Sequence, residues 1–271
     1  MDFKNYFEKY RSNTLAGSSN QTFFISDGQP HESRIYYKIF AGGKFNYSLL
    51  FTNTIDSTFA DGSHSVCNVV CDGWELCKAS VGRTRESYID SAVPPEDEIP
   101  LTFDGKTSKT VGKGERFCSD NFEFEAKSDE YMCVTLTFKG EMIPYHDELK
   151  IASFVKTENG FEPSKKTPLP IMIGCDRAHD LNIAFLGDSI TQGIGATPNS
   201  YLHWNARLAN LLGDRHAYWN IGIGYARSGD AASDGIWLER AKHNDLVFVC
   251  LGVNDIQRGI PTDDIKNNLL K

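Results

Sequence analysis

Ser189 is the side chain of this sequence that is best placed to act as a nucleophile. It lies in the segment IAFLGDSITQGIGA, where an apolar run ends at Gly187, Asp188 and Ser189 and a glycine-rich turn follows. The apolar run predicts a buried strand, so the serine hydroxyl is expected at the tip of that strand. A serine hydroxyl attacks a carbonyl only when a general base takes its proton. The tripeptide alone also fits a plain turn in which Ser189 caps the following helix.

Polar residues also accompany the ends of two later apolar runs. The run AYWNIGIG contains Asn220 and ends at Gly224, and the run DLVFVCLG is followed by a segment that contains Asn254 and Asp255. Ligands of open α/β sheets bind beyond the carboxyl ends of the strands, so we expect these residues to gather there. Taken alone, the second stretch also fits a turn in which Asn254 bonds to its own backbone.

Residues 179–271 must supply the elements that position these groups. The strand candidates LNIAFLG, AYWNIGIG and DLVFVCLG alternate with the helix candidates SYLHWNARLANLLG, GIWLERAKH and PTDDIKNNLLK. Near-continuous apolar strands that alternate with helices predict a parallel α/β sheet. The third strand, apolar on both faces, is expected to be covered by helices on both sides.

Residues 1–178 have a different hydrophobic pattern, in which apolar and polar residues alternate. The run KFNYSLLF places Phe45, Tyr47, Leu49 and Phe51 on one face, and YMCVTLTF alternates in the same way. Such runs, separated by clusters of Gly, Asp, Asn and Ser, predict antiparallel strands with one buried face. Only the first dozen or so residues predict a helix. The predicted fold class is therefore α/β, with an N-terminal antiparallel β-sandwich, jelly-roll-like, followed by a partial parallel α/β domain.

The three strand ends together resemble the SGNH hydrolases, also called the GDSL esterase/lipase family. FLGDSITQG matches the first block of that family, NIGIG resembles the block that supplies a glycine, and LGVND matches the block that supplies an asparagine. The resemblance covers residues 181–258. It implies that Ser189 is the nucleophile and that Asp188 organises the turn. It also implies an oxyanion hole formed by the backbone N–H of Ser189, the N–H near Gly224 and the side-chain amide of Asn254.

The sequence departs from the family in two respects. The family usually has its glycine at the position that Tyr225 occupies here, so either Gly224 or Tyr225 supplies the second oxyanion N–H. The family also takes its catalytic Asp and His from a late D-x-x-H block. The two D-x-x-H strings of this sequence, which end at His64 and His179, both precede Ser189.

Histidine positions therefore leave the general base unassigned within this chain. His179 precedes the first strand and Ser189 follows it, so the two are separated by roughly 20 Å. His203 and His243 are expected to pack on helices or lie at the surface. We expect the base to come from residues after Lys271 or from a second chain. The natural gene would then continue for about 80 to 120 residues.

The resemblance implies a carboxylic ester hydrolase that uses no cofactor and no metal. Its expected substrate is a small acylated molecule such as an acetylated sugar. The sugar rests on a second likeness, because the β-rich part resembles the jelly roll that precedes the SGNH domain in some carbohydrate esterases. The alternative is a carbohydrate-binding or interaction protein whose hydrolase half is inactive.

Composition and charge exclude other classes of protein. The 271 residues carry a formal net charge of -8, which argues against nucleic acid and anionic membranes as partners. No run approaches the roughly 18 apolar residues of a membrane span, and the start MDFKNYFEKYRSN has no signal-peptide core. Seven scattered cysteines without a Cys-x-x-Cys pair predict reduced thiols. We therefore expect a cytoplasmic protein; the sequence sets no oligomeric state.

Overall fold

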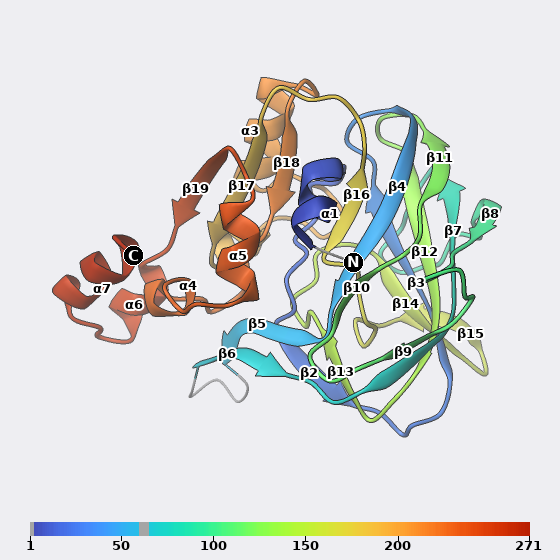
Figure 1. Ribbon diagram of the computed structural model, residues 1–271, viewed down its shortest axis with the longest axis horizontal. Coiled ribbons are helices and arrows are strands. Elements are labelled where there is room, and N and C mark those ends of the chain that lie inside the picture. Colours follow the sequence, from blue (N-terminus) through green and yellow to red (C-terminus); the bar gives the residue numbers. More distant parts are fainter. Residues whose placement is uncertain (1–2, 60–64) are drawn as a thin grey trace.

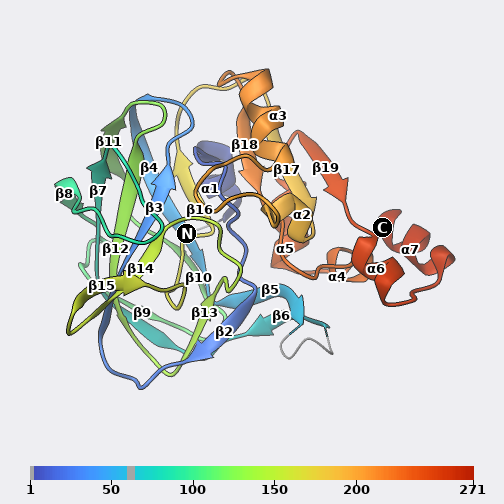
Figure 2. The same cartoon turned by 180° about the vertical axis from the view of Figure 1, so that it is seen from behind.

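The computed structural model describes residues 3–59 and 65–271. Antiparallel sheets form one side of the molecule and a smaller parallel sheet with helices forms the other, as Figures 1 and 2 show from opposite directions. We call the described residues up to 175 the β part and residues 182–271 the α/β part. The boundary after residue 178 that the sequence suggests stays a prediction.

Two antiparallel sheets dominate the β part. The first contains β1 (Arg11–Ser12), β4 (Gly43–Thr52), β10 (Arg116–Cys118), β11 (Phe122–Ala126) and β16 (Met172–Cys175). The second contains β3 (His31–Lys38), β7 (Trp74–Thr84), β8 (Glu96–Pro100), β9 (Lys109–Val111), β12 (Tyr131–Lys139), β14 (Ser153–Thr157) and β15 (Gly160–Pro163). Two smaller antiparallel pairs join β2 (Thr22–Ile25) to β13 (Met142–Tyr145) and β5 (Thr54–Phe59) to β6 (Ser65–Val70).

One apolar cluster of buried residues joins the two large sheets and continues into the α/β part. Tyr47 and Leu49 of β4 belong to the same buried cluster as Val134 and Leu136 of β12. The alternation in both sequence runs therefore points one row of side chains from each sheet into this core. The predicted antiparallel structure is confirmed, whereas the jelly-roll-like connection of the strands stays a prediction.

The second face of β4 is buried as well, which the alternating pattern did not predict. Leu50 packs in another apolar cluster with Tyr6 and Phe7 of helix α1 (Phe3–Lys9) and with Ala184 of the α/β part. The strand is covered on both faces because α1 and the α/β part lie against the outside of its sheet (Figure 1). Helix α1 confirms the helix predicted at the N-terminus.

The α/β part contains the predicted parallel sheet. Strand β17 (Asn182–Gly187) lies between β18 (Ala217–Asn220) and β19 (Leu246–Cys250) and pairs in parallel with both. The helices are α2 (Ser189–Gln192), α3 (Trp204–Leu212), α4 (Ser228–Ala231), α5 (Ile236–Lys242), α6 (Val253–Gln257) and α7 (Thr262–Leu269). Strand–helix alternation thus places the carboxyl ends of all three strands at one edge.

The described residues differ from two expectations for these strands. The second strand ends at Asn220 rather than Gly224, because the Asn220 side chain accepts from the N–H of Gly222 at 3.0 Å and turns the chain. The third strand is not covered on both faces, since Leu246 is 43% and Val249 is 51% exposed. Strand β19 is an edge strand, and α6 and α7 lie beyond its end rather than on its face (Figure 1).

All seven cysteines are free thiols in the structure, and they differ in burial. Cys71, Cys133 and Cys175 are buried, whereas Cys250 is exposed on β19. Within the described ranges, no helix is long and apolar enough to cross a membrane.

Candidate active site

The polar strand ends meet at the carboxyl edge of the parallel sheet. The N–H of Asp188 donates to the carbonyl oxygen of Cys250 at 3.3 Å, which joins the end of β17 to the end of β19. The N–H of Ile223 donates to the carbonyl oxygen of Gly187 at 3.0 Å, which joins the segment after β18 to β17. The segments that carry Ser189, Gly224 and Asn254 are therefore neighbours.

Ser189 lies on a tight turn between β17 and α2. A Cβ at position 187 would lie 2.2 Å from Oγ1 of Thr191, so only glycine fits this turn. The residue that caps α2 is Asp188, whose side chain accepts from the N–H of Ile190 at 2.9 Å. The turn interpretation in which Ser189 itself is the cap is therefore wrong. As the first residue of the helix, Ser189 is half-buried.

The hydroxyl and the backbone N–H of Ser189 are the two polar groups that this turn presents besides the Asp188 carboxylate. Neither group forms a hydrogen bond within the part of the chain that the structure describes. Asp188 beside it is buried, and burial raises the pKa of its carboxyl group, with a smaller contribution from the nearby Asp255. Asp188 is thus turned towards the helix backbone, which suits a residue that organises the turn.

Gly224 lies at the contact between the β part and the α/β part. A Cβ at this position would lie 1.8 Å from Oε2 of Glu148 and 2.7 Å from Nε2 of Gln21, so a larger residue would displace these two side chains. Its N–H makes no hydrogen bond to the described residues. The next residue, Tyr225, has a φ of 64°, the left-handed region that glycine favours. The backbone at Tyr225 therefore has a conformation that glycine, the residue usual at this position in the family, adopts more easily than tyrosine.

Asn254 approaches the same segment from α6. Its Nδ2 donates to the carbonyl oxygen of Ala226 at 2.9 Å, and the side chain is 8% exposed. The turn in which Asn254 bonds to its own backbone is therefore not formed. The neighbouring Asp255 accepts from both the N–H and the hydroxyl of Ser228, the latter at 2.6 Å. These bonds hold α6 and α4 together and leave one amide N–H of Asn254 for another partner.

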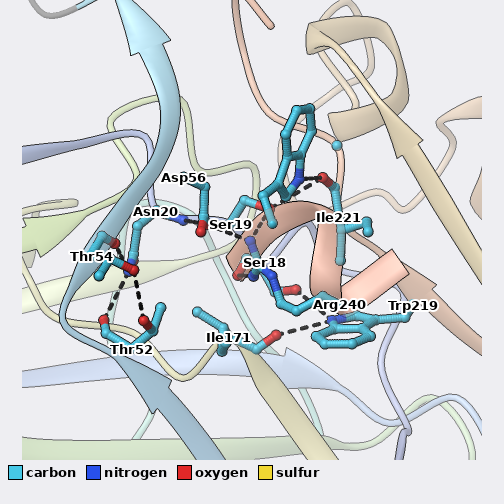
Figure 3. Close-up of polar contacts among 12 residues, drawn as sticks. Ser18, Ser19, Asn20, Thr52, Thr54, Asp56, Ile171, Trp219, Ile221 and Arg240 are labelled. Atoms are coloured by element: carbon cyan, nitrogen blue, oxygen red, sulfur yellow. Dashed lines mark hydrogen bonds and ion pairs between the residues drawn. The ribbon is translucent and has the colours of Figure 1, made fainter. Parts of the chain in front are cut away.

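A buried polar network, shown in Figure 3, fixes the start of the segment that leads to Gly224. The carbonyl oxygen of Ile221 accepts from Nε1 of Trp237 at 2.7 Å and from the hydroxyl of Ser19 at 3.2 Å. Arg240 of α5 forms an ion pair with Asp56 of β5 at 2.5 Å, and both side chains are almost fully buried. Side chains of both parts therefore determine where this segment lies.

Neither His203 nor His243 forms a hydrogen bond to Ser189. The Nε2 of His203 lies 3.2 Å from the carbonyl oxygen of Leu15, and burial lowers the pKa of this ring. The ring of His243 stacks on Phe7 with centroids 4.4 Å apart. Both are packing residues, as the sequence predicts.

The remaining histidine candidates lie elsewhere. His179 precedes β17 and bonds to the carbonyl oxygen of Arg177, so it is at the opposite end of the strand from Ser189. His64 lies outside the described residues. Among the residues that are described, no group of His, Cys, Asp and Glu side chains is arranged to hold a metal ion.

Glu148 is a residue of the site that the sequence did not indicate. It comes from the β part, is half-buried, and places its carboxylate against Gly224. Gln21 donates to this carboxylate at 3.2 Å, and Gln192 of α2 donates to the backbone carbonyl of Glu148 at 2.5 Å. Burial raises the pKa of the Glu148 carboxyl group. No local pattern marks such a residue, because its partners are remote in sequence.

The comparisons with known proteins bear on the α/β part. Residues 185–271 match the GDSL-like lipase/acylhydrolase family. AlinE4, described as an SGNH-hydrolase family esterase, is a solved structure with 24% sequence identity and a TM-score of 0.28. The match covers 34% of this chain and 50% of that protein, so the chain spans about half of its length. The comparison with curated proteins gave no similar sequence.

The family match includes all three strand ends, from the turn at Ser189 to the segment after Asn254. It confirms the resemblance that these motifs suggest. The C-terminal part of this chain, residues 185–271, is therefore similar to the GDSL-like lipase/acylhydrolase family, in agreement with the SGNH hydrolase motifs.

Proposed function

We propose that the protein is a serine esterase whose substrates are acyl esters, with O-acetyl esters of carbohydrate as the substrate class. One observation carries the proposal: the segments of Ser189, Gly224 and Asn254 meet at the carboxyl edge of the parallel sheet. The family match of residues 185–271 supports ester hydrolysis. The N–H groups of Ser189 and Gly224 are unpaired within the described residues, as donors to an oxyanion must be before substrate binds.

In the proposed reaction the Ser189 hydroxyl oxygen attacks the ester carbonyl carbon. A general base takes the hydroxyl proton, and the carbonyl oxygen becomes an oxyanion. The N–H groups of Ser189 and Gly224 and the amide of Asn254 would donate to that oxyanion. The alcohol then leaves with a proton, and water hydrolyses the acyl-enzyme at Ser189. Loss of one such donor typically costs about 100-fold to 1,000-fold in rate.

The base is the part of the mechanism that the described residues do not supply, because none of them hydrogen-bonds to the Ser189 hydroxyl. In the proposed enzyme, a histidine with its aspartate reaches Ser189 as the family resemblance implies. The same observation favours a second candidate function, a carbohydrate-binding protein whose hydrolase part is inactive. In that protein the strand ends would keep their geometry, but the hydroxyl would stay unreactive.

The carbohydrate part of the proposal is supported by the β part. Its two antiparallel sheets share an apolar core, and Glu148 and Gln21 of the β part contact the α/β part at Gly224. A jelly-roll-like domain in this place resembles the arrangement of some carbohydrate esterases, which is an argument by analogy.

A fluorophosphonate probe distinguishes the two candidate functions, because it reacts with activated serine hydroxyls. The full-length protein should be labelled at Ser189, and peptide mass analysis should locate the label. The Ser189→Ala variant is the control and should take up no label. A protein that stays unlabelled but retains an acetylated glycan on an affinity column would be the binding protein instead.

A further inference from the structure

An open pocket of about 600 Å³ lies beside the candidate active site. Its walls come from two places: Ile194 and Pro198 belong to the turn after α2, and the rest belongs to the β part. The N–H of Ile194 donates to the carbonyl oxygen of Ser189 at 2.8 Å. The turn that carries the proposed nucleophile therefore continues directly into the wall of the pocket.

Glu148 connects the pocket with the proposed oxyanion hole. Glu148 lines the pocket, and its carboxylate also lies against Gly224. The backbone carbonyl of Glu148 is bonded to Gln192 of α2 at 2.5 Å. One wall residue thus touches both the helix that follows Ser189 and the segment of Gly224. Glu148 and Ile194 are thus the wall residues that connect the pocket with the segments of Gly224 and Ser189.

The size of the pocket decides which half of the ester occupies it. An acetyl group has a single methyl group beyond its carbonyl carbon, whereas pockets of roughly 300 to 1,000 Å³ enclose ligands of drug size. The occupant is therefore the alcohol half of the substrate. Leu149 and Ile151, both 4% exposed overall, contribute apolar surface to the wall, which suits the apolar face of a sugar ring.

The charged groups of the wall are mostly cationic. Lys150, Lys165 and Lys166 all line the pocket, and none of the three forms an ion pair within the described residues. The opposing carboxylates are Asp147 and Glu148. A chain with a formal net charge of -8 thus presents three ammonium groups against two carboxylates here. Lysine is a point charge that attracts anions without demanding one geometry.

We propose that this pocket binds the alcohol half of the ester, and that Lys150, Lys165 and Lys166 select an acylated sugar that carries an anionic group, a carboxylate or a sulfate. The inference rests on the proposed esterase function and names its substrate class. The carboxylates of Asp147 and Glu148 would accept hydrogen bonds from the sugar hydroxyls, while the lysines meet the anionic group.

The test compares kcat/KM of the full-length protein on three acetylated methyl glycosides: a glucoside, a glucuronoside and a sulfated glucoside. The anionic sugars should be preferred over the neutral one by about tenfold, the combined effect expected of two exposed ion pairs. A preference for both anionic sugars would show selection by charge, and a preference for one of them would identify that anion as the natural one. Equal values for all three sugars would overturn the proposal.

Two double variants show whether the pocket lysines cause the preference. Lys165→Ala/Lys166→Ala should lose about tenfold more on the anionic sugars than on the neutral sugar. The control Lys78→Ala/Lys106→Ala removes the same charge from exposed lysines outside the pocket, and it should keep the preference. Equal losses on all sugars in the first variant, or an equal loss of preference in the control, would contradict the assignment.

Binding without turnover separates this inference from the proposed function. The Ser189→Ala variant should bind the acetylated glucuronoside, measured by calorimetry, more tightly than the glucoside, and high salt should remove the difference. If p-nitrophenyl acetate is hydrolysed in a Ser189-dependent manner but no sugar preference exists, the pocket assignment fails and the esterase stands. If neither ester is hydrolysed, the proposed function fails.

Discussion

At the scale of single residues, Asn254 offers the clearest kinetic signature. Replacement by Ala should lower kcat about 100-fold to 1,000-fold and change KM little, because the oxyanion exists only after attack. Steady-state kinetics with p-nitrophenyl acetate measure both constants. Asn244→Ala is the control, since Asn244 bonds only to the carbonyl oxygens of Arg240 and Ala241 among the described residues and should not affect turnover. A change confined to KM would make Asn254 a residue that binds the ground state.

Tyr225 should be strained by its backbone conformation. Its φ is 64°, and the side chain is 45% exposed. Tyr225→Gly should be more stable than Tyr225→Ala by about 1 kcal/mol, because only glycine adopts this conformation without cost. Urea unfolding of the two variants measures the difference. An Ala variant at least as stable as the Gly variant would show that the backbone is relaxed at this position.

The sequence indicated some residues of the site and missed others for physical reasons. Ser189 and Asn254 were found because polar residues at the ends of apolar runs mark the edge of a parallel sheet. Asp188 rather than Ser189 caps α2. Because Asp and Ser are both common N-cap residues, the sequence alone did not distinguish the two. Glu148 was not found, since it meets Gln21 across 127 residues of sequence and no periodic pattern reports such a contact.

At the scale of helices and strands, the ion pair between Arg240 of α5 and Asp56 of β5 should hold the two parts together. The side chains are 1% and 0% exposed, so Arg240→Met would leave a buried carboxylate without its partner. We expect this variant to lose about 3 to 5 kcal/mol in the free energy of unfolding. Asp56→Asn/Arg240→Met should cost less than the sum of its single changes, because both charges are removed together.

An exposed ion pair is the matched control for that measurement. Arg215 and Asp180 form a salt bridge with side chains that are 71% and 49% exposed. Arg215→Met should cost less than about 1 kcal/mol. Similar losses for Arg215→Met and Arg240→Met, measured by urea unfolding, would contradict the importance of the buried pair.

The lengths and faces of the strands were predicted less well than their existence. Alternation correctly gave one buried face of β4, but Leu50 on the opposite face is buried too because α1 covers it. The apolar run of the third strand predicted burial on both faces, yet β19 is an edge strand with Val249 51% exposed. A run of apolar residues shows which side chains of a strand are suited to burial. Whether they are buried depends on the strands and helices that pack against that strand in the fold.

At the scale of the whole molecule, His146 should make stability depend on pH. The ring is fully buried, and burial lowers its pKa from 6.5 to about 4. Between pH 6.5 and 4 the imidazole of the unfolded chain is protonated, whereas the buried ring of the folded protein stays neutral. The contribution of the neutral His146 to stability is therefore complete above pH 6.5 and is lost as pH falls towards 4. The loss should be about 2 kcal/mol by pH 5.

Urea unfolding at several pH values tests that expectation. His146→Gln removes the titrating ring, so the variant should show a smaller decrease in stability between neutral pH and pH 5 than the original protein. The comparison uses the slopes with pH, so a general loss of stability in the variant does not affect it. Equal slopes would show that His146 does not cause the pH dependence.

The central claim for the whole molecule is that it hydrolyses esters through Ser189. The most direct measurement is the turnover of p-nitrophenyl acetate by the full-length protein and by its Ser189→Ala variant. The variant should retain its circular dichroism spectrum and thermal midpoint, because Ser189 is half-buried and its hydroxyl bonds to no described residue. Its kcat should fall by about 1,000-fold or more, since no nucleophile remains. Undiminished turnover in a folded Ser189→Ala variant would contradict the account.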